Sequence, residues 1–121
     1  APDWEDQYLV QALEVIGQSG IDGLIATNTT IDHSTVKDEL HGAESGGLSG
    51  KPLLTSANTI LKRSREVLGP QFPIIGVGGI TSGEDGAEKA RLGADLVQIY
   101  TGLIYQGPKL IQECVEAWPH R

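Results

Sequence analysis

The chain has 121 residues, enough for one modest domain, with 39 % hydrophobic and 21 % charged residues as in ordinary soluble globular proteins. A formal net charge of −7 argues against nucleic acid as a partner, since the chain has no cationic field to attract a phosphate backbone. The single cysteine, Cys114, excludes an intrachain disulfide, and no apolar run approaches the roughly 20 residues of a membrane span. We expect a soluble protein of a reducing compartment, with Cys114 as a structural thiol facing the core.

The first third of the chain predicts a helix, a strand and a long loop. Apolar residues recur at helical spacing over residues 4–18, and Asp3 is a candidate N-cap for this helix. The apolar run that begins at Gly23 predicts a strand buried on both faces. The polar residues 29–52 are too numerous for an ordinary connection, which favours a functional or a disordered loop.

A second helix is predicted from Thr55 or Ser56, either of which could cap it, to Gly69. Its basic cluster, formed by Lys62, Arg63 and Arg65, is typical of a solvated helix face.

The remaining elements alternate. They are a strand in "FPIIGVG", a helix whose front carries Ser82, a strand in "ADLVQIY", a short turn in "TGLIYQG", and a last helix whose first residue is Pro108. Apolar strands separated by helices predict an α/β fold with a parallel sheet and right-handed crossovers. Three strands are too few to close a barrel by themselves, and a small doubly wound domain is a second option.

Two successive strands end in segments suited to an anion. The glycines of "PIIGVGGI" (73–80) and the segment "QIYTG" (98–102) lie one βα unit apart. A phosphate needs several converging N–H donors, and glycines leave room for it, as in the last two loops of many (β/α)8 barrels. The alternative is that the glycines only permit a tight turn between strand and helix.

Two further segments suggest a planar ligand. Asn28, in "ATNTT", carries an amide that matches the imide edge of a pyrimidine, although Asn and Thr are also common turn formers after a strand. In "ESGGLSGKPL", Gly46, Gly47 and Gly50 would let the backbone approach a ligand, or would simply make the loop flexible. The histidines at 33, 41 and 120 lack metal-site spacing and are expected to be solvated.

Together, "IDGLIATNTT", "GGLSGKPL", "PIIGVGGI" and "GADLVQIYTGLIYQGP" closely resemble the C-terminal part of class 2, quinone-linked dihydroorotate dehydrogenases. The resemblance covers nearly the whole chain, with four motifs in the same order at matching spacing. It implies that residues 1–121 are the C-terminal fragment, about three βα units, of a single FMN-binding domain with the (β/α)8 TIM-barrel fold. The implied reaction is oxidation of dihydroorotate to orotate, with quinone as the final acceptor, in de novo pyrimidine biosynthesis.

The resemblance also implies roles for eight residues. Asn28 and Thr29 match substrate-binding positions. The positions that match FMN contacts are Thr27, Gly50, Gly78, Gly79, Tyr100 and Thr101, of which the two adjacent glycines form the phosphate-binding turn.

The resemblance also implies that some functional groups of the enzyme lie outside this chain. The catalytic base and a lysine that contacts FMN are expected upstream of residue 1, within the remainder of the barrel, so we expect the 121-residue chain alone to be inactive. Membrane contact is expected only through an N-terminal segment that is also missing. The implied location is the cytoplasmic side of the inner membrane in a bacterium, or the mitochondrial inner membrane in a eukaryote.

Two alternatives stay open. One is another FMN- or phosphate-binding barrel enzyme that shares the last two loops. The other is a non-catalytic half-barrel that dimerises, in which a partner covers the exposed strand edges.

Overall fold

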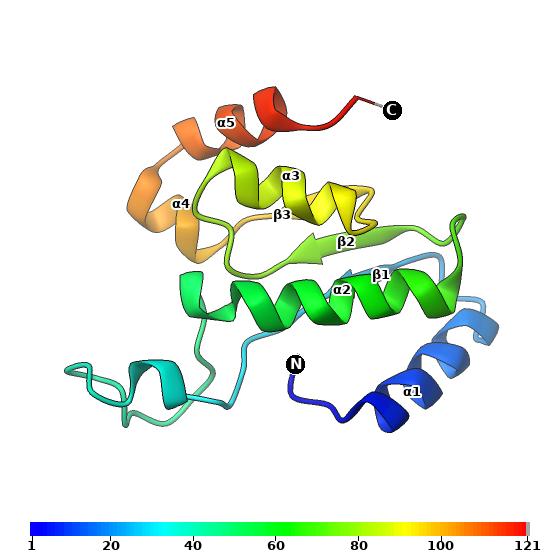
Figure 1. Ribbon diagram of the computed structural model, residues 1–121, viewed down its shortest axis with the longest axis horizontal. Coiled ribbons are helices and arrows are strands. Elements are labelled where there is room, and N and C mark those ends of the chain that lie inside the picture. Colours follow the sequence, from blue (N-terminus) through cyan, green and yellow to red (C-terminus); the bar gives the residue numbers. More distant parts are fainter. Residues whose placement is uncertain (121) are drawn as a thin grey trace.

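The computed structural model describes residues 1–120, in which helices alternate with the strands of one sheet (Figure 1). The elements are α1 (Asp6–Gln18), β1 (Leu24–Ala26), two 3₁₀ turns (Ser34–Val36 and Lys51–Leu53), α2 (Leu54–Leu68), β2 (Ile74–Val77), α3 (Gly83–Arg91), β3 (Leu96–Gln98), α4 (Thr101–Gln106) and α5 (Lys109–Ala117). The predicted order of helices and strands is confirmed, with one addition. The segment expected to be a short turn before Pro108 forms the helix α4, which ends at the positive-φ Gly107.

The three strands form a parallel sheet in the order β1-β2-β3. Ala26 lies opposite Gly76, and Val77 lies opposite Gln98. Because the strands are parallel, their carboxyl ends meet at one edge of the sheet. The loop after β1 and the helix α4 lie at that edge, on the left of Figure 1.

The core lies between the sheet and its helices. Leu61 of α2 and Ile74 of β2 are fully buried and pack with Ala94, and a second cluster joins α1 to α2. Cys114 of α5 is 4 % exposed and packs against Ile80, which confirms its predicted place in the core. Burial raises the pKa of the Cys114 thiol, as expected for a structural cysteine.

The other face of the sheet has no covering layer among residues 1–120. Ile25 and Leu96 both lie opposite Ile75 in neighbouring strands, and both are 61 % exposed. The prediction that β1 is buried on both faces is therefore wrong for the described chain. The physical reason is that the helices pack on only one side, whereas parallel sheets are normally covered on both.

Helix starts show where local sequence signals succeed and fail. Ser82 lies at the start of α3 as predicted, and its hydroxyl caps the helix by accepting a hydrogen bond from the Asp85 N–H. Asp3 does not cap α1, because its carboxylate accepts hydrogen bonds from the Thr30 hydroxyl and from the Ile31 N–H (3.0 Å).

The predicted caps of α2 are also wrong. A 3₁₀ turn over Lys51–Leu53 leads directly into the helix, and no side chain caps it. The Ser56 hydroxyl instead donates to the Leu53 carbonyl (3.1 Å).

The basic cluster on α2 is only partly solvated. Lys62 is exposed, and Arg63 pairs with the exposed carboxylates of Asp6 and Glu66. Arg65 contradicts the prediction. Its guanidinium donates to the carbonyls of Gly69, Phe72 and Gly93 and to the Asp95 carboxylate (2.8 Å), so it fastens α2 to the connections that precede β2 and β3. The five donors of guanidinium explain why a nominal surface charge serves as a clamp.

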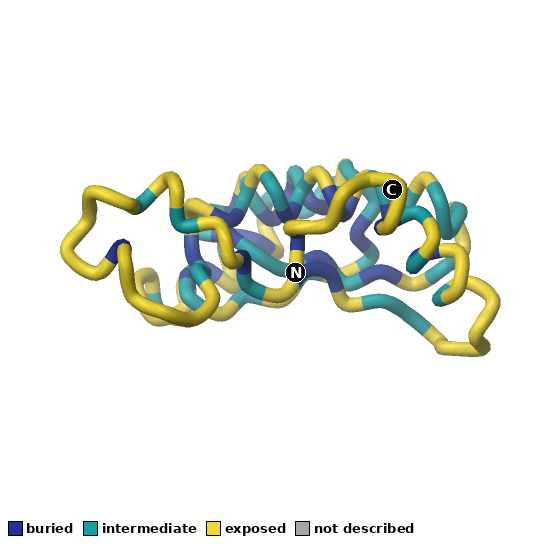
Figure 2. The backbone as a smooth tube through the Cα atoms, turned by 90° about the horizontal axis from the view of Figure 1, so that it is seen from below, coloured by how far each residue is buried: buried dark blue, intermediate teal, exposed yellow. Residues whose placement is uncertain are grey.

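The loop over residues 31–47 is almost wholly exposed and projects from the carboxyl edge of the sheet (Figure 2). Its two ends are joined by an antiparallel bridge in which Thr30 and Leu48 exchange backbone hydrogen bonds (3.1 and 2.8 Å). Inside it, the ring nitrogens of His33 lie 3.0 and 2.9 Å from the carbonyl oxygens of Gly42 and Gly46. His33 is half-buried, so the prediction of a solvated histidine is wrong there, whereas His41 is exposed beside Glu44.

No helix within residues 1–120 has both the length and the apolar character needed to cross a bilayer.

Lys89 of α3 is the largest fully buried side chain described, and its ammonium donates to Asn58 Oδ1 (2.6 Å). Burial lowers the pKa of Lys89 from 10.5 to about 8, opposed in part by the nearby Asp85 carboxylate. Between pH 8 and 10.5 the unfolded chain therefore binds more protons at this site than the folded one, so the stability contribution of Lys89 rises with pH and is lowest below pH 8.

We expect the difference in unfolding free energy between the wild type and Lys89→Met to shift in favour of the wild type by about 3 kcal/mol from pH 8 to 10.5. Urea unfolding across that range measures it, and Cys114 and the tyrosines cancel because both proteins contain them. Lys62→Met, which removes an exposed lysine from α2, is the control. A pH-independent difference for Lys89→Met would contradict the prediction.

Candidate functional site

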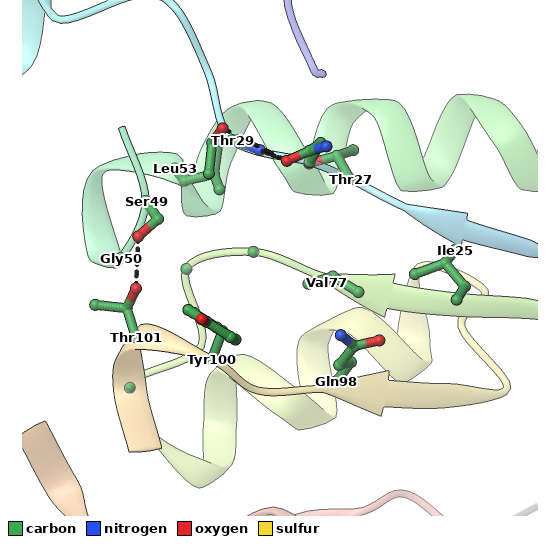
Figure 3. Close-up of a pocket in the computed structure, with 14 residues that line it drawn as sticks. Ile25, Thr27, Thr29, Ser49, Gly50, Leu53, Val77, Gln98, Tyr100 and Thr101 are labelled. Carbon is green, nitrogen blue, oxygen red and sulfur yellow. Dashed lines mark hydrogen bonds between the residues drawn. The ribbon is translucent and has the colours of Figure 1, made fainter. Parts of the chain in front are cut away.

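A cavity of about 390 Å³ lies at the carboxyl edge of the sheet (Figure 3). Its size is within the usual range for small-molecule and cofactor sites. The chain brings all eight predicted site residues together in its wall, which consists of Ile25, Thr27, Asn28, Thr29, Ser49, Gly50, Leu53, Val77, Gly78, Gly79, Gln98, Tyr100, Thr101 and Gly102. Residues up to 77 positions apart thus meet because three parallel strands end at the same edge.

The turn after β2 requires glycine for reasons of packing. Gly78 and Gly79 have φ of +115° and +79°, and a Cβ on Gly79 would lie 2.4 Å from the Leu54 Cα. The start of α2 therefore packs directly onto this turn. Among residues 1–120 the N–H groups of both glycines make no hydrogen bond, and both residues line the cavity. The two interpretations of the glycines are thus compatible, since a tight turn also presents two free N–H donors.

The amide of Asn28 is held in one orientation. Its Oδ1 accepts a hydrogen bond from the Thr29 N–H (2.8 Å), as the dashed line in Figure 3 marks. The Nδ2 group keeps its two donors with no protein partner among the described residues. Asn28 is exposed at the end of β1, so these donors are available to a ligand.

The long loop packs closely on Thr29. A Cβ on Gly47 would lie 1.8 Å from Thr29 Oγ1, so only glycine allows this approach. Gly46 and Gly47 do not line the cavity, and Gly50 does. Of the three glycines expected to approach a ligand, two therefore serve the loop itself.

Thr27 is held by the sheet and has an unused hydroxyl. Its N–H donates to the Val77 carbonyl (3.0 Å), which extends the β1–β2 pairing by one step. Its Oγ1 is buried and has no hydrogen-bond partner among the described residues. An unpaired buried hydroxyl is costly, so a group bound in the cavity would gain by pairing with it.

The far wall of the cavity joins the long loop to the turn after β3. Gly50 has φ of +83°, and a Cβ there would lie 3.2 Å from Thr101 Cγ2. The hydroxyls of Ser49 and Thr101 lie 2.5 Å apart (Figure 3). Tyr100 is 75 % exposed and offers its ring to whatever fills the cavity.

Six wall residues were not predicted: Ile25, Ser49, Leu53, Val77, Gln98 and Gly102. Strand alternation could have found three of them, because Ile25, Val77 and Gln98 lie on the open face of the sheet. Ser49 and Leu53 have no such signal, since their positions depend on how the long loop folds back.

The described wall holds no charged side chain, and its polar groups are mainly amide, hydroxyl and backbone N–H donors. Such a surface can bind an anion by neutral donors, without an ion pair. No group of three metal-ligating side chains occurs within residues 1–120.

Comparisons with known proteins agree with this geometry. The family model for dihydroorotate dehydrogenase matches residues 1–121. The chain belongs to the dihydroorotate dehydrogenase family. Two relatives named dihydroorotate dehydrogenase (quinone), from Verminephrobacter eiseniae and Stenotrophomonas maltophilia, are 53 % and 50 % identical to it over 117 residues.

These dihydroorotate dehydrogenases are longer proteins. Each alignment covers 97 % of this chain but only 32 % and 33 % of the relative, so the chain spans about a third of their length. The crystal structure of DHODH from Eimeria tenella in complex with ferulenol matches with a TM-score of 0.89 and 35 % identity, over 97 % of this chain and 31 % of that one. The ligand-free form from the same organism also gives 0.89. The predicted fold class is thereby confirmed, namely an α/β segment of a TIM barrel.

Proposed function

We propose that this chain is the part of a quinone-linked dihydroorotate dehydrogenase that holds the FMN phosphate and orients the pyrimidine substrate. The observation that carries the proposal is the meeting of all eight predicted residues in one cavity at the carboxyl edge of the sheet. Ligands of α/β barrels bind at that edge. The quinone-linked relatives give the reaction class.

The cavity fits FMN in its chemistry. The phosphate accepts hydrogen bonds, and the turn after β2 offers two free N–H donors. The described wall contains no cationic side chain, so binding depends on how these neutral donors are placed and not on charge alone. The unpaired Thr27 hydroxyl and the exposed ring of Tyr100 suit polar and planar parts of a flavin. When bound, FMN would supply the hydride acceptor for oxidation of dihydroorotate to orotate, and a quinone would receive the electrons.

Different residues of this chain would then bind the phosphate of FMN and the pyrimidine substrate. Gly78, Gly79 and Thr101 hold the phosphate end, and Gly50 lets the loop backbone come close. Asn28, with its Oδ1 fixed by Thr29, aims two amide donors at the oxygens of the pyrimidine or of its carboxylate. Such orientation matters because a small misplacement of the reacting atoms is costly in rate.

The catalytic base is assigned to the remainder of the barrel. Tyr100 is the only titratable side chain among the described wall residues. A base and an FMN-contacting lysine are therefore expected upstream, and membrane contact is assigned to an N-terminal segment. The protein would then lie peripherally on the inner membrane, facing the cytoplasm in a bacterium, or on the mitochondrial inner membrane in a eukaryote.

A hybrid enzyme tests the proposal. In it, these 121 residues replace the matching third of the Verminephrobacter eiseniae relative. We expect the hybrid enzyme to retain FMN and to reduce a quinone with dihydroorotate, while the 121-residue chain alone shows no turnover. A hybrid that folds but binds no FMN would refute the phosphate and flavin assignments, and turnover by the isolated chain would refute the assignment of the base.

One alternative is a non-catalytic half-barrel that dimerises. The exposed Ile25 and Leu96 favour it to the extent that a second copy could cover this open face of the sheet. Sedimentation of the isolated chain distinguishes the two, since a stable monomer argues against the half-barrel. Another FMN enzyme that shares only the last two loops is disfavoured, because the family model matches the whole chain.

A further inference from the structure

One contact in the cavity wall has no role in the proposed function. Ser49 Oγ and Thr101 Oγ1 lie 2.5 Å apart, 52 positions apart in sequence, and both line the cavity. Neither hydroxyl has another protein partner among the described residues. Figure 3 shows the pair bridging the loop before α2 and the start of α4.

The backbone fixes Ser49 at this place. The preceding residue, Leu48, is bonded in both directions to Thr30 at the end of the β1 loop. The following residue, Gly50, packs within 3.2 Å of the Thr101 methyl, measured from an ideal Cβ position. Ser49 is therefore held from both sides against Thr101.

Once an anion is bound, the number of hydroxyl hydrogens decides which of Ser49 and Thr101 donates the hydrogen bond between them. Each hydroxyl has one hydrogen and two lone pairs, and only one hydrogen can lie between the two oxygens. A phosphate dianion can only accept hydrogen bonds, so Thr101 binds it only by donating its own hydroxyl hydrogen. The hydrogen between the two oxygens must then come from Ser49.

We propose that Ser49 is a positioning residue for FMN, which acts by donating its hydroxyl hydrogen to Thr101 and so turns the Thr101 hydrogen toward the phosphate. The inference rests on the proposed function, because it assumes that Thr101 meets the phosphate. Ser49 itself does not touch the cofactor. A chain of two hydroxyls that ends on an anion also polarises the terminal O–H group and strengthens the hydrogen bond that this group donates.

The test compares FMN with riboflavin, which lacks the phosphate, in the apo form of the hybrid enzyme, with dissociation constants taken from quenching of flavin fluorescence. Ser49→Ala should weaken FMN about 5-fold and leave riboflavin unchanged, and Thr101→Val should weaken FMN about 30-fold. The double variant should bind FMN as Thr101→Val does, because Ser49 has nothing to act on once the Thr101 hydroxyl is gone. Ser56→Ala, which removes a part-buried hydroxyl outside this cavity, is the matched control and should change neither affinity.

The outcomes separate the two proposals. If Ser49→Ala weakens FMN equally with and without the Thr101 hydroxyl, Ser49 binds the phosphate directly and the inference fails. If the parent hybrid prefers FMN to riboflavin but Ser49→Ala keeps that preference in full, the inference also fails while the phosphate site stands. If the parent hybrid shows no preference for FMN, the phosphate assignment itself fails. Unchanged riboflavin affinity in each variant shows that the protein is folded.

Discussion

Asn28→Asp in the hybrid enzyme is expected to weaken orotate binding about 100-fold while FMN is retained. The substitution keeps the shape of the side chain and an oxygen that can accept the Thr29 N–H, which bonds to Asn28 at 2.8 Å. It replaces the two free amide donors with a negative charge that repels an anionic pyrimidine. Titration of the flavin absorbance with orotate measures the affinity, and the flavin content of the purified protein measures FMN retention.

Asn28→Ala provides the matched comparison, because it removes the donors without adding charge. Its loss of orotate affinity should be about 10-fold, clearly less than that of Asn28→Asp. Equal loss of FMN and orotate in both variants would show that Asn28 supports the fold of the site and has no specific role in holding the substrate.

Gly79→Ala is expected to lower the free energy of unfolding by about 4 kcal/mol and to abolish FMN binding. Two costs add together. The residue has φ of +79°, and a Cβ would lie 2.4 Å from the Leu54 Cα and 2.5 Å from the Leu54 nitrogen, where only backbone could yield. Movement of α2 away from the turn would also displace the two free N–H groups from the cavity.

Gly107→Ala separates these two costs. Gly107 has nearly the same φ, +75°, and nothing lies within 4 Å of its ideal Cβ position. The free energy of unfolding of Gly107→Ala should therefore fall by only about 1 kcal/mol, which is the cost of a strained left-handed residue, and this variant should still bind FMN. Urea unfolding of both variants and of the parent measures the difference, and equal losses would mean that the contact with α2 is not what demands glycine at Gly79.

The contrast between sequence and structure follows physical lines. The order of helices and strands along the chain and the parallel sheet depend on apolar runs and on the breaks between them, which are local signals, and these predictions are confirmed. Two of the failures involve contacts between distant segments. Asp3 serves Thr30 and Ile31 instead of its own helix, and Arg65 bonds to carbonyls on two other loops.

The site shows the same division. Asn28, Gly79 and Thr101 could be proposed from the sequence because each follows a strand or belongs to a motif of the family. The bond between Ser49 and Thr101 could not, since it depends on how 17 residues of polar loop fold back over Thr30 to Leu48. Equally, no local pattern reveals that glycine is required at Gly47 by the close approach of Thr29, or at Gly79 by the close approach of Leu54.

The bridge between Thr30 and Leu48 also has a practical meaning for protein engineering. The chain leaves the cavity wall and returns to it at one paired point. Of the loop contacts described above, only that of Gly47 with Thr29 reaches a wall residue, since His33 bonds within the loop and Ile31 bonds to Asp3. Lengthening a loop whose ends are already fixed adds little closure entropy. The exposed residues around Lys37 and Asp38 are therefore a suitable place to graft an epitope or a fluorescent reporter that leaves the ligand site intact.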